Sequence, residues 1–274
     1  MLPNSSYNGA TVNLQQLLIP YPQYPVPGAP QSTSNGVVEE YANAGESYYN
    51  SLNVRMQKRW TNGLLLIENF SYSALVERVN YLNDSDPAPE KRVGGDSRPL
   101  RETLAASWQL PFGRGKHFDL ANKALNAIAG GWGMNGALIL QSGPPLSWGN
   151  IVYLGGPLDW NPHPQNPLTP GATLNTAQFL TASSLQPSDG LRWFDTYFNN
   201  LRRDPTKNVD LSLLKRFNLR ERMYLQLRFE GFNITNRVGF GAPVSLTPTS
   251  ASFGEITTQA NTPRRVQVGV RLVW

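Results

Sequence analysis

The sequence contains no cysteine among its 274 residues. That absence excludes disulfide frameworks, catalytic thiols and cysteine-ligated metal sites, but it does not identify a cellular compartment. Histidine is almost as scarce, because His117 and His163 are the only two and lie in different connections. A histidine zinc site or a Ser-His-Asp triad therefore has little support. We expect no enzymatic activity, no metal and no cofactor.

Long apolar runs are also missing. No stretch approaches the roughly 18 consecutive apolar residues of a membrane-spanning helix, and the mean hydropathy is -0.37. These two features exclude a helical membrane protein. Residues 1–7 carry neither a basic segment nor an apolar segment, so they do not form a secretory signal peptide. If the protein is exported, we expect its true beginning to be missing from this sequence.

Positive charge is in moderate excess, with a formal net charge of +5. The basic residues are scattered as short pairs: Lys58-Arg59, Arg202-Arg203, Lys215-Arg216 and Arg264-Arg265. Pairs spread in this way are typical of a solvated or lumen-facing wall rather than of a nucleic-acid-binding patch. Nucleic acid is therefore not an expected partner.

Glycine and proline are abundant, with 24 and 22 residues, and neither follows a collagen-like period. This composition indicates many turns and long loops, which favours an all-β fold. The letters G-x-G-x-x-G occur at residues 131–136, but a strand-like apolar segment follows them. Because the dinucleotide fingerprint needs a helix at that point, we interpret the match as accidental.

The last ten residues alternate strictly between apolar and polar side chains. Side chains of a strand alternate between its two faces, so one face carries Val266, Val268, Val270, Leu272 and Trp274, and the other carries Arg265, Gln267, Gly269 and Arg271. Chain termini usually fray into water. A terminus that is apolar, aromatic and regular therefore predicts the closing strand of a membrane barrel.

Six further stretches show the same alternation and predict strands at about 51–60, 64–72, 103–112, 131–142, 209–217 and 223–229. Their second faces are too charged for a buried sandwich core but suit a wet lumen. Glu68 interrupts one apolar row, so either a bulge shifts the register there or Leu65 and Ile67 mark the outward side. Asp119 is expected to cap one short helix containing Leu120, Ala124 and Ile128.

The connections between these strands alternate between short and long, as in up-and-down membrane barrels with short periplasmic turns and long outer loops. In this orientation the short-turn ends should carry lipid-facing aromatic residues, because aromatic rings prefer the membrane interface. A girdle is therefore predicted from Trp60, Phe112, Trp132, Phe217 and Trp274. The alternative is that these are core aromatics of a soluble barrel.

The longest connection concentrates aromatic residues among proline, glycine and asparagine. Loops of this length are usually functional or disordered. We expect this loop, together with those at Tyr21 to Tyr49 and Arg237 to Arg264, to form an outer vestibule; the alternative is decoration without a binding role. The candidate ligand contacts are Trp148, Tyr153, Trp160, Arg192 and Trp193.

Eight short motifs, in this order and spacing, make nearly the whole chain resemble the C-terminal barrel of Oar-like TonB-dependent outer-membrane receptors, a family with a carboxypeptidase-regulatory-like domain. They are LLIPYPQY (17–24), SYYNSL (47–52), KRWTNG (58–63), LPFGRGK (110–116), GGW (130–132), RWF (192–194), NVDLSL (208–213) and EGFNITN (230–236). Three residues depart from the family pattern: Glu68, Glu102 and a final Trp274 in place of phenylalanine.

The resemblance implies a Gram-negative outer-membrane location and a large barrel that encloses a plug. Residues 1–274 would then be the C-terminal part of one barrel domain, a partial antiparallel up-and-down sheet of about seven strands with open edges. The plug and the N-terminal domains would be absent. The implied partners are outer-membrane lipid, the rest of the barrel and plug, TonB through the missing N-terminal region, and the barrel-assembly machinery, which would read the terminal strand with Trp274.

The expected function is ligand binding and uptake as a fragment of such a receptor. Two alternatives share the membrane location, namely a passive porin-like channel and a surface adhesin. A third is a soluble all-β carbohydrate-binding module whose tryptophans stack on sugars. A plug and a TonB box upstream would distinguish the receptor from the channel, and solubility without detergent would favour the soluble module.

Overall fold

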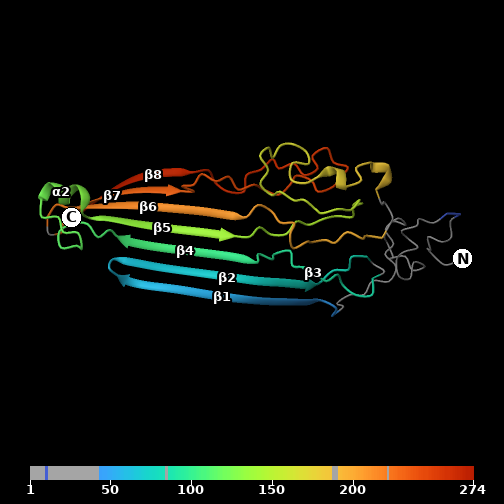
Figure 1. The fold of residues 1–274 in the computed structure, drawn as a ribbon, viewed down its shortest axis with the longest axis horizontal. Coiled ribbons are helices and arrows are strands. Elements are labelled where there is room, and N and C mark those ends of the chain that lie inside the picture. Colours follow the sequence, from blue (N-terminus) through green and yellow to red (C-terminus); the bar gives the residue numbers. More distant parts are fainter. Residues whose placement is uncertain (1–9, 12–42, 84–85, 187–190, 221) are drawn as a thin grey trace.

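The fold is an antiparallel sheet with a folded body of loops at one end (Figure 1). It is known from a computed structural model that describes residues 10–11, 43–83, 86–186, 191–220 and 222–274. The motif at 17–24, and most of the predicted vestibule segment from Tyr21 to Tyr49, lie outside these residues.

Eight strands form the sheet, and seven of them follow one another in chain order. The order is β1-β2-β4-β5-β6-β7-β8, with β3 beside β2, and every pairing between these strands is antiparallel. The bounds are β1 Glu46–Thr61, β2 Leu64–Arg78, β3 Arg92–Val93, β4 Leu100–Gln109, β5 Trp132–Gln141, β6 Thr206–Asn218, β7 Tyr224–Phe232 and β8 Arg265–Val273. The up-and-down all-β prediction is confirmed. Among the described residues the sheet stays open, with β1 and β8 as its edges.

The pairing register brings the apolar rows of all seven main strands onto one face. Leu52 lies opposite Tyr72, Leu104 opposite Leu138, and Phe229 opposite Val268. Directly opposed residues in antiparallel strands share a face of the sheet. Apolar side chains on this face are exposed, for example 67% for Val270, as expected for a surface that contacts lipid rather than protein. We call it the apolar face and the opposite one the polar face.

Glu68 lies on the apolar face, and the pairing around it is regular. It stands opposite Met56 on one side and Leu104 on the other. Glu102 occupies the same face, opposite Phe70 and Leu140. Both expectations for Glu68 are therefore wrong, since neither a bulge nor a reversal of the outward side moves this carboxylate away from the apolar row.

The turn between β1 and β2 depends on left-handed backbone conformations. Asn62 and Gly63 have φ angles of 53° and 76°, which asparagine and glycine adopt at low cost. The one irregularity in the register of this pair falls between Lys58 and Thr61, where Trp60 also has a positive φ of 23°. Trp60 therefore leaves the regular alternation that predicted its side.

A short helix, α2 (Lys123–Ala129), occupies the connection between β4 and β5. Its N-cap is Asn122, whose side-chain oxygen accepts hydrogen bonds from the amides of Ala124 and Leu125. The predicted helix is present, but the predicted cap is wrong. Asp119 instead accepts a hydrogen bond from the Gly115 amide at 3.0 Å, which closes a turn before the helix begins.

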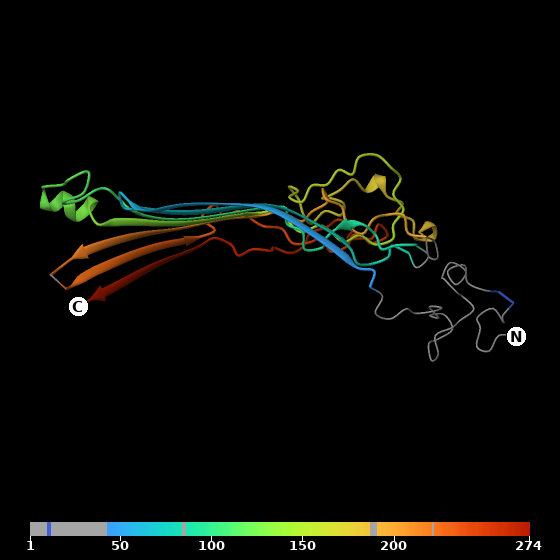
Figure 2. The same ribbon diagram turned by 90° about the horizontal axis from the view of Figure 1, so that it is seen from below.

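The hydrophobic core lies in the loops, at the end opposite α2 (Figures 1 and 2). The described parts of the connections 79–99, 142–205 and 233–264 gather there, and we call them together the loop cap. Two single-turn helices, η3 (Thr176–Gln178) and η4 (Ser183–Leu185), belong to the longest of them. The buried core residues are Leu146, Trp148, Ile151, Leu174, Phe179, Phe194, Leu201 and Phe253. The sheet itself is one layer, so neither of its faces forms a core of comparable burial.

Candidate functional site

The loop cap is built around Trp148. Its side chain is 2% exposed, lies parallel to the Phe179 ring at a centroid distance of 6.0 Å and meets Phe194 edge-on at 5.6 Å. Phe179 in turn meets Phe253 at 5.3 Å, which joins two of the connections. Aromatic pairs of this geometry add stability beyond the area that they bury. The loop cap is therefore a packed body, not a set of independent loops.

Three of the five predicted ligand contacts serve this packing. Trp148 is buried, and Tyr153 and Trp160 are half-buried against the core. The Trp160 indole nitrogen donates to the Arg202 carbonyl at 2.6 Å, and the Tyr153 hydroxyl donates to the Gly156 carbonyl. These rings are committed to neighbours within the loop cap, so a bound molecule would reach little of them.

Arg192 and Trp193 lie side by side in the chain but have different surroundings. The Arg192 backbone amide donates to Asn83 Oδ1 at 2.6 Å, and Asn83 Nδ2 donates to the Arg192 carbonyl at 3.1 Å. The Arg192 guanidinium donates to the carbonyls of Phe194 and Trp148, and burial lowers its pKa. Trp193 is 85% exposed. Of the five predicted contacts, Trp193 alone offers a nearly free ring on a backbone held by its neighbours.

Glu90 fixes the same segment from the other side. Its carboxylate accepts hydrogen bonds from the Thr196 amide and hydroxyl, both at 2.9 Å, and forms an ion pair with Arg92 at 3.3 Å. Burial, followed by repulsion from Glu90, raises the pKa of the Asp195 carboxyl. The segment 192–196 therefore presents the Trp193 ring beside the exposed Asp195, whose carboxyl has a raised pKa.

A buried aspartate joins the two longest connections. The Asp204 side chain is fully buried. Its carboxylate accepts hydrogen bonds from Arg237 Nη2 at 2.6 Å and from the Phe240 amide at 2.9 Å. It also lies 3.1 Å from His163 Nδ1. His163 also stacks on the Phe240 ring at 4.4 Å. No sequence pattern pointed to this cluster, because its members are far apart in the chain. Proximity in three dimensions is the only signal.

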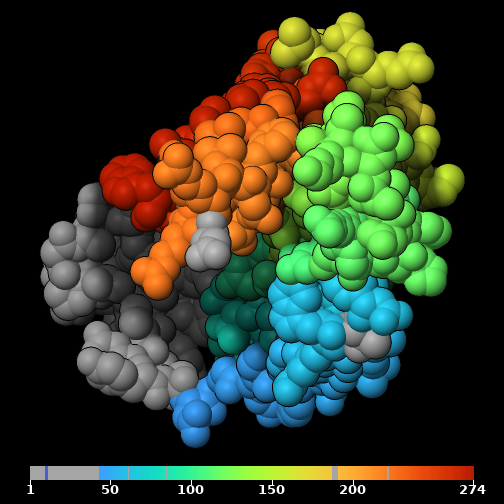
Figure 3. All heavy atoms as spheres, turned by 90° about the vertical axis from the view of Figure 1, so that its left-hand side faces the viewer, coloured from blue at the N-terminus to red at the C-terminus, as the bar shows by residue number. Residues whose placement is uncertain are grey.

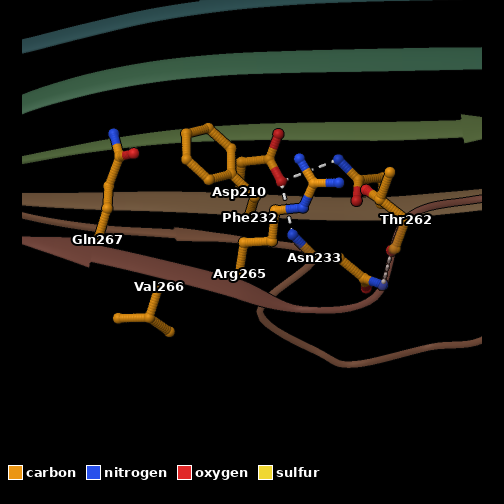
Figure 4. Close-up of a pocket in the computed structure, with 8 residues that line it drawn as sticks. Asp210, Phe232, Asn233, Thr262, Arg265, Val266 and Gln267 are labelled. Carbon is orange, nitrogen blue, oxygen red and sulfur yellow. Dashed lines mark hydrogen bonds between the residues drawn. The ribbon is translucent and has the colours of Figure 1, made fainter.

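The polar face of β6, β7 and β8 forms a wall below the loop cap. A hollow of about 650 Å³ opens on it, lined by Asn208, Asp210, Phe232, Asn233, Thr262, Arg265, Val266 and Gln267. Figure 4 shows Asp210, Arg265 and Gln267 on one side of the strands and Val266 on the other. Asp210 Oδ1 accepts from the Asn233 amide at 2.8 Å. Charged and amide side chains dominate this wall, and its role as the lining of a water-filled lumen stays a prediction.

The predicted aromatic girdle lies at the opposite end, near α2 and the C-terminus (Figure 1). Trp132 lies opposite Lys215, and Phe217 opposite Leu225, which places both rings on the apolar face. Phe112 follows the end of β4 and stacks on Phe118 at 5.2 Å. Trp60 and Trp274 are 57% and 88% exposed. The membrane role of these five rings stays a prediction.

One residue on the apolar face was overlooked in the sequence. Lys215 interrupts the row between Leu213 and Phe217, yet its side chain is only 2% exposed. Its ammonium group donates to the carbonyls of Ile128 and Gly130 and lies 5.2 Å from the Trp132 ring centre. The available signal was the lysine itself, since a charge in an apolar row needs a partner.

Comparison with known proteins agrees with this architecture. Residues 2–267 match the family described as "Outer membrane beta barrel domain". No curated protein matches the chain. None of the helices in the described residues has the length and apolar character needed to cross a membrane. With strands of alternating character, one exposed apolar face and a family match over almost its entire length, the chain belongs to the outer membrane beta barrel domain family and is an outer-membrane protein.

Proposed function

We propose that the chain is the C-terminal part of an Oar-like TonB-dependent receptor, which binds a ligand at the cell surface and takes it up across the outer membrane. The rest of the barrel, the plug and the TonB-contacting region would come from the remainder of the protein. The activity is binding and transport, without catalysis and without a cofactor.

The observation that carries this proposal is the preorganised loop cap above a polar wall. A binding surface that is ordered before the ligand arrives loses less conformational entropy on binding. The backbone around Trp193 is held by Asn83 and by Glu90, and the side chain remains exposed. An exposed aromatic ring on an ordered backbone is a suitable first contact for a ligand, since it offers a large area with few rotatable bonds.

The polar wall is compatible with transport through the barrel. Arg228, Arg265 and Arg271 stand on the polar face of β7 and β8, where the Arg228 guanidinium pairs with Glu230 at 3.5 Å. Charged groups of both signs at short separation suit a water-filled or plug-contacting interior.

Two measurements on the complete protein separate the receptor from its alternatives. In a planar lipid bilayer bathed in potassium chloride, the purified receptor should show no steady conductance, because a plug closes the lumen. It should also retain the purified periplasmic domain of TonB on an affinity resin, and lose it when the upstream TonB box is deleted. Steady conductance without TonB binding would support the passive channel. Absence of both would support the adhesin.

The soluble carbohydrate-binding module requires a different test. A receptor of this family should stay with the membrane fraction and migrate as a heat-modifiable band in electrophoresis. A complete protein that remained in solution without detergent, with the same mobility before and after boiling, would favour the soluble module and end the receptor proposal.

A further inference from the structure

The connection between β4 and β5, residues 110–131, exposes four large apolar side chains, more than a short connection surrounded by water would be expected to expose. Leu125 and Ile128 are 55% and 72% exposed, and Phe112 and Phe118 are 40% and 50% exposed. Leu125 and Ile128 are three residues apart on α2, so they share one side of the helix. This connection lies at the short-turn end of the sheet (Figure 1).

The connection packs onto the apolar face of the sheet. Lys215, which belongs to the apolar row opposite Trp132 and Leu227, donates to the Ile128 carbonyl at 3.0 Å. The Trp132 indole nitrogen donates to the same carbonyl at 2.8 Å. Figures 2 and 3 show α2 on the convex side, away from the direction in which the sheet bends towards β8. The helix is therefore on the outside of the barrel wall.

The exposure of the apolar side chains does not come from fraying. Asn122 caps the helix, and Asn126 Oδ1 accepts from the Arg114 amide at 2.8 Å, which ties the preceding turn to the helix. Phe112 and Phe118 stack on each other with an angle of 21° between the rings. Lys215 satisfies carbonyls at the C-terminal end, where a cation is favoured by the helix dipole.

Basic side chains accompany the apolar ones. Arg114, Lys116 and Lys123 are all exposed, and they outnumber the one carboxylate of the connection, exposed Asp119. A short segment with an apolar side and an excess of exposed cations is suited to the boundary between acyl chains and anionic headgroups.

We propose that residues 110–131 form an interfacial anchor that inserts Leu125, Ile128, Phe112 and Phe118 into the headgroup layer of the membrane, on the outside of the barrel at its short-turn end. The occupant of this surface is anionic phospholipid. The anchor continues the lipid-facing surface of β5 and β6, because Trp132 and Phe217 adjoin it on the same face. It rests on membership of the barrel family and does not depend on ligand uptake.

None of the 274 residues is a cysteine, so an introduced cysteine is the single labelling site in this part of the protein. Single variants Leu125→Cys and Ile128→Cys carry a nitroxide label in the complete protein, reconstituted in vesicles of phosphatidylcholine and phosphatidylglycerol. Ala127→Cys is the matched control, being exposed but on another side of the same helix. Val268→Cys on the apolar face and Gln267→Cys on the polar face calibrate the two extremes. Heat-modifiable migration verifies that each variant is folded.

The labels at Leu125 and Ile128 should be accessible to oxygen and shielded from a water-soluble nickel chelate, with a depth shallower than that at Val268. The label at Ala127 should be exposed to the chelate. If the labels at Leu125 and Ile128 reach the chelate as freely as the one at Ala127, the anchor does not exist.

A second experiment tests whether insertion depends on the charge of the lipid. In vesicles of phosphatidylcholine alone, the labels at Leu125 and Ile128 should become more accessible to the chelate. Lys116→Gln combined with Lys123→Gln should produce the same change in vesicles that contain phosphatidylglycerol. Equal depth under all these conditions would overturn the assignment of anionic lipid as the occupant.

Discussion

Asp204 and Arg237 form an ion pair of 2.6 Å between two connections of the loop cap, with the Asp204 side chain fully buried. Asp204→Asn should loosen the loop cap by about 3 kcal/mol, because removal of one partner leaves a partly buried guanidinium uncompensated. Hydrogen exchange followed by mass spectrometry should show faster exchange in 233–264. Exposed Asp159 provides the control, since Asp159→Asn should leave exchange unchanged; equal behaviour of the two variants would contradict the role assigned to Asp204.

Asp195 should make the loop cap less stable as the pH rises. Burial and repulsion from Glu90 raise the pKa of its carboxyl in the folded protein, so the folded state binds the proton more tightly than the unfolded state. The penalty is absent below the ordinary aspartate pKa and complete above the raised one. Asp195→Asn should therefore slow exchange around 192–196 at neutral pH, and the difference should vanish at acidic pH. Faster exchange in the variant at neutral pH would argue against this assignment.

Glu68 should destabilise the barrel in its membrane. Its neighbours across the strands are Met56 and Leu104, so its carboxylate stands among lipid-facing side chains. Glu68→Leu should raise the free energy of unfolding in urea by about 1 to 2 kcal/mol, because a charged group on the lipid face is costly. The matched control is Asn69→Leu on the polar face, which should give no comparable gain. A loss of stability in Glu68→Leu would indicate a partner for this carboxylate in the intact barrel.

The terminal strand should guide assembly through its apolar row. Trp274→Ala is expected to lower the amount of heat-modifiable barrel in the outer membrane several-fold, because our proposal gives this aromatic residue after β8 a part in the assembly signal. Arg271→Ala, on the polar face of the same strand, should have a much smaller effect. Quantitative immunoblotting of membrane fractions measures both. If the two variants assemble equally well, the terminal tryptophan is not part of the signal.

Lys215 should hold α2 against the sheet. Lys215→Met keeps the length of the side chain but removes the donors to the Ile128 and Gly130 carbonyls. Exchange of the α2 amides should increase, because the carbonyl of buried Gly130 loses its side-chain donor and the Ile128 carbonyl keeps only the Trp132 indole. Exposed Lys123→Met on the helix itself is the comparison and should exchange as the unmodified protein does. Unchanged exchange in Lys215→Met would show that the helix docks without this lysine.

The sheet was predictable because its information is local. Side chains in a strand alternate with a period of two, so the apolar rows, the short turn at Asn62-Gly63 and the approximate strand bounds could be derived from neighbouring residues. The register then followed, because a slip by one residue would move a whole apolar row to the wet face. Glu68 and Glu102 show the limit of this reasoning. A single carboxylate does not change the register, because the many apolar residues in the same row determine which face the strand presents.

The loop cap could not be derived in this way. Aromatic residues in the long connections indicated function in the sequence, but Trp148 and Trp160 became part of a core that forms only when two distant connections meet. The same holds for Asp204, whose partner Arg237 is 33 residues away, and for Lys215, whose partner Ile128 is 87 residues away. The sequence by itself determined the strands, their two faces and the outer-membrane character, since these depend on local periodicity. Only the tertiary structure decided which loop residues are buried, which side of the wall α2 covers and which ring remains exposed, because those depend on contacts between distant segments.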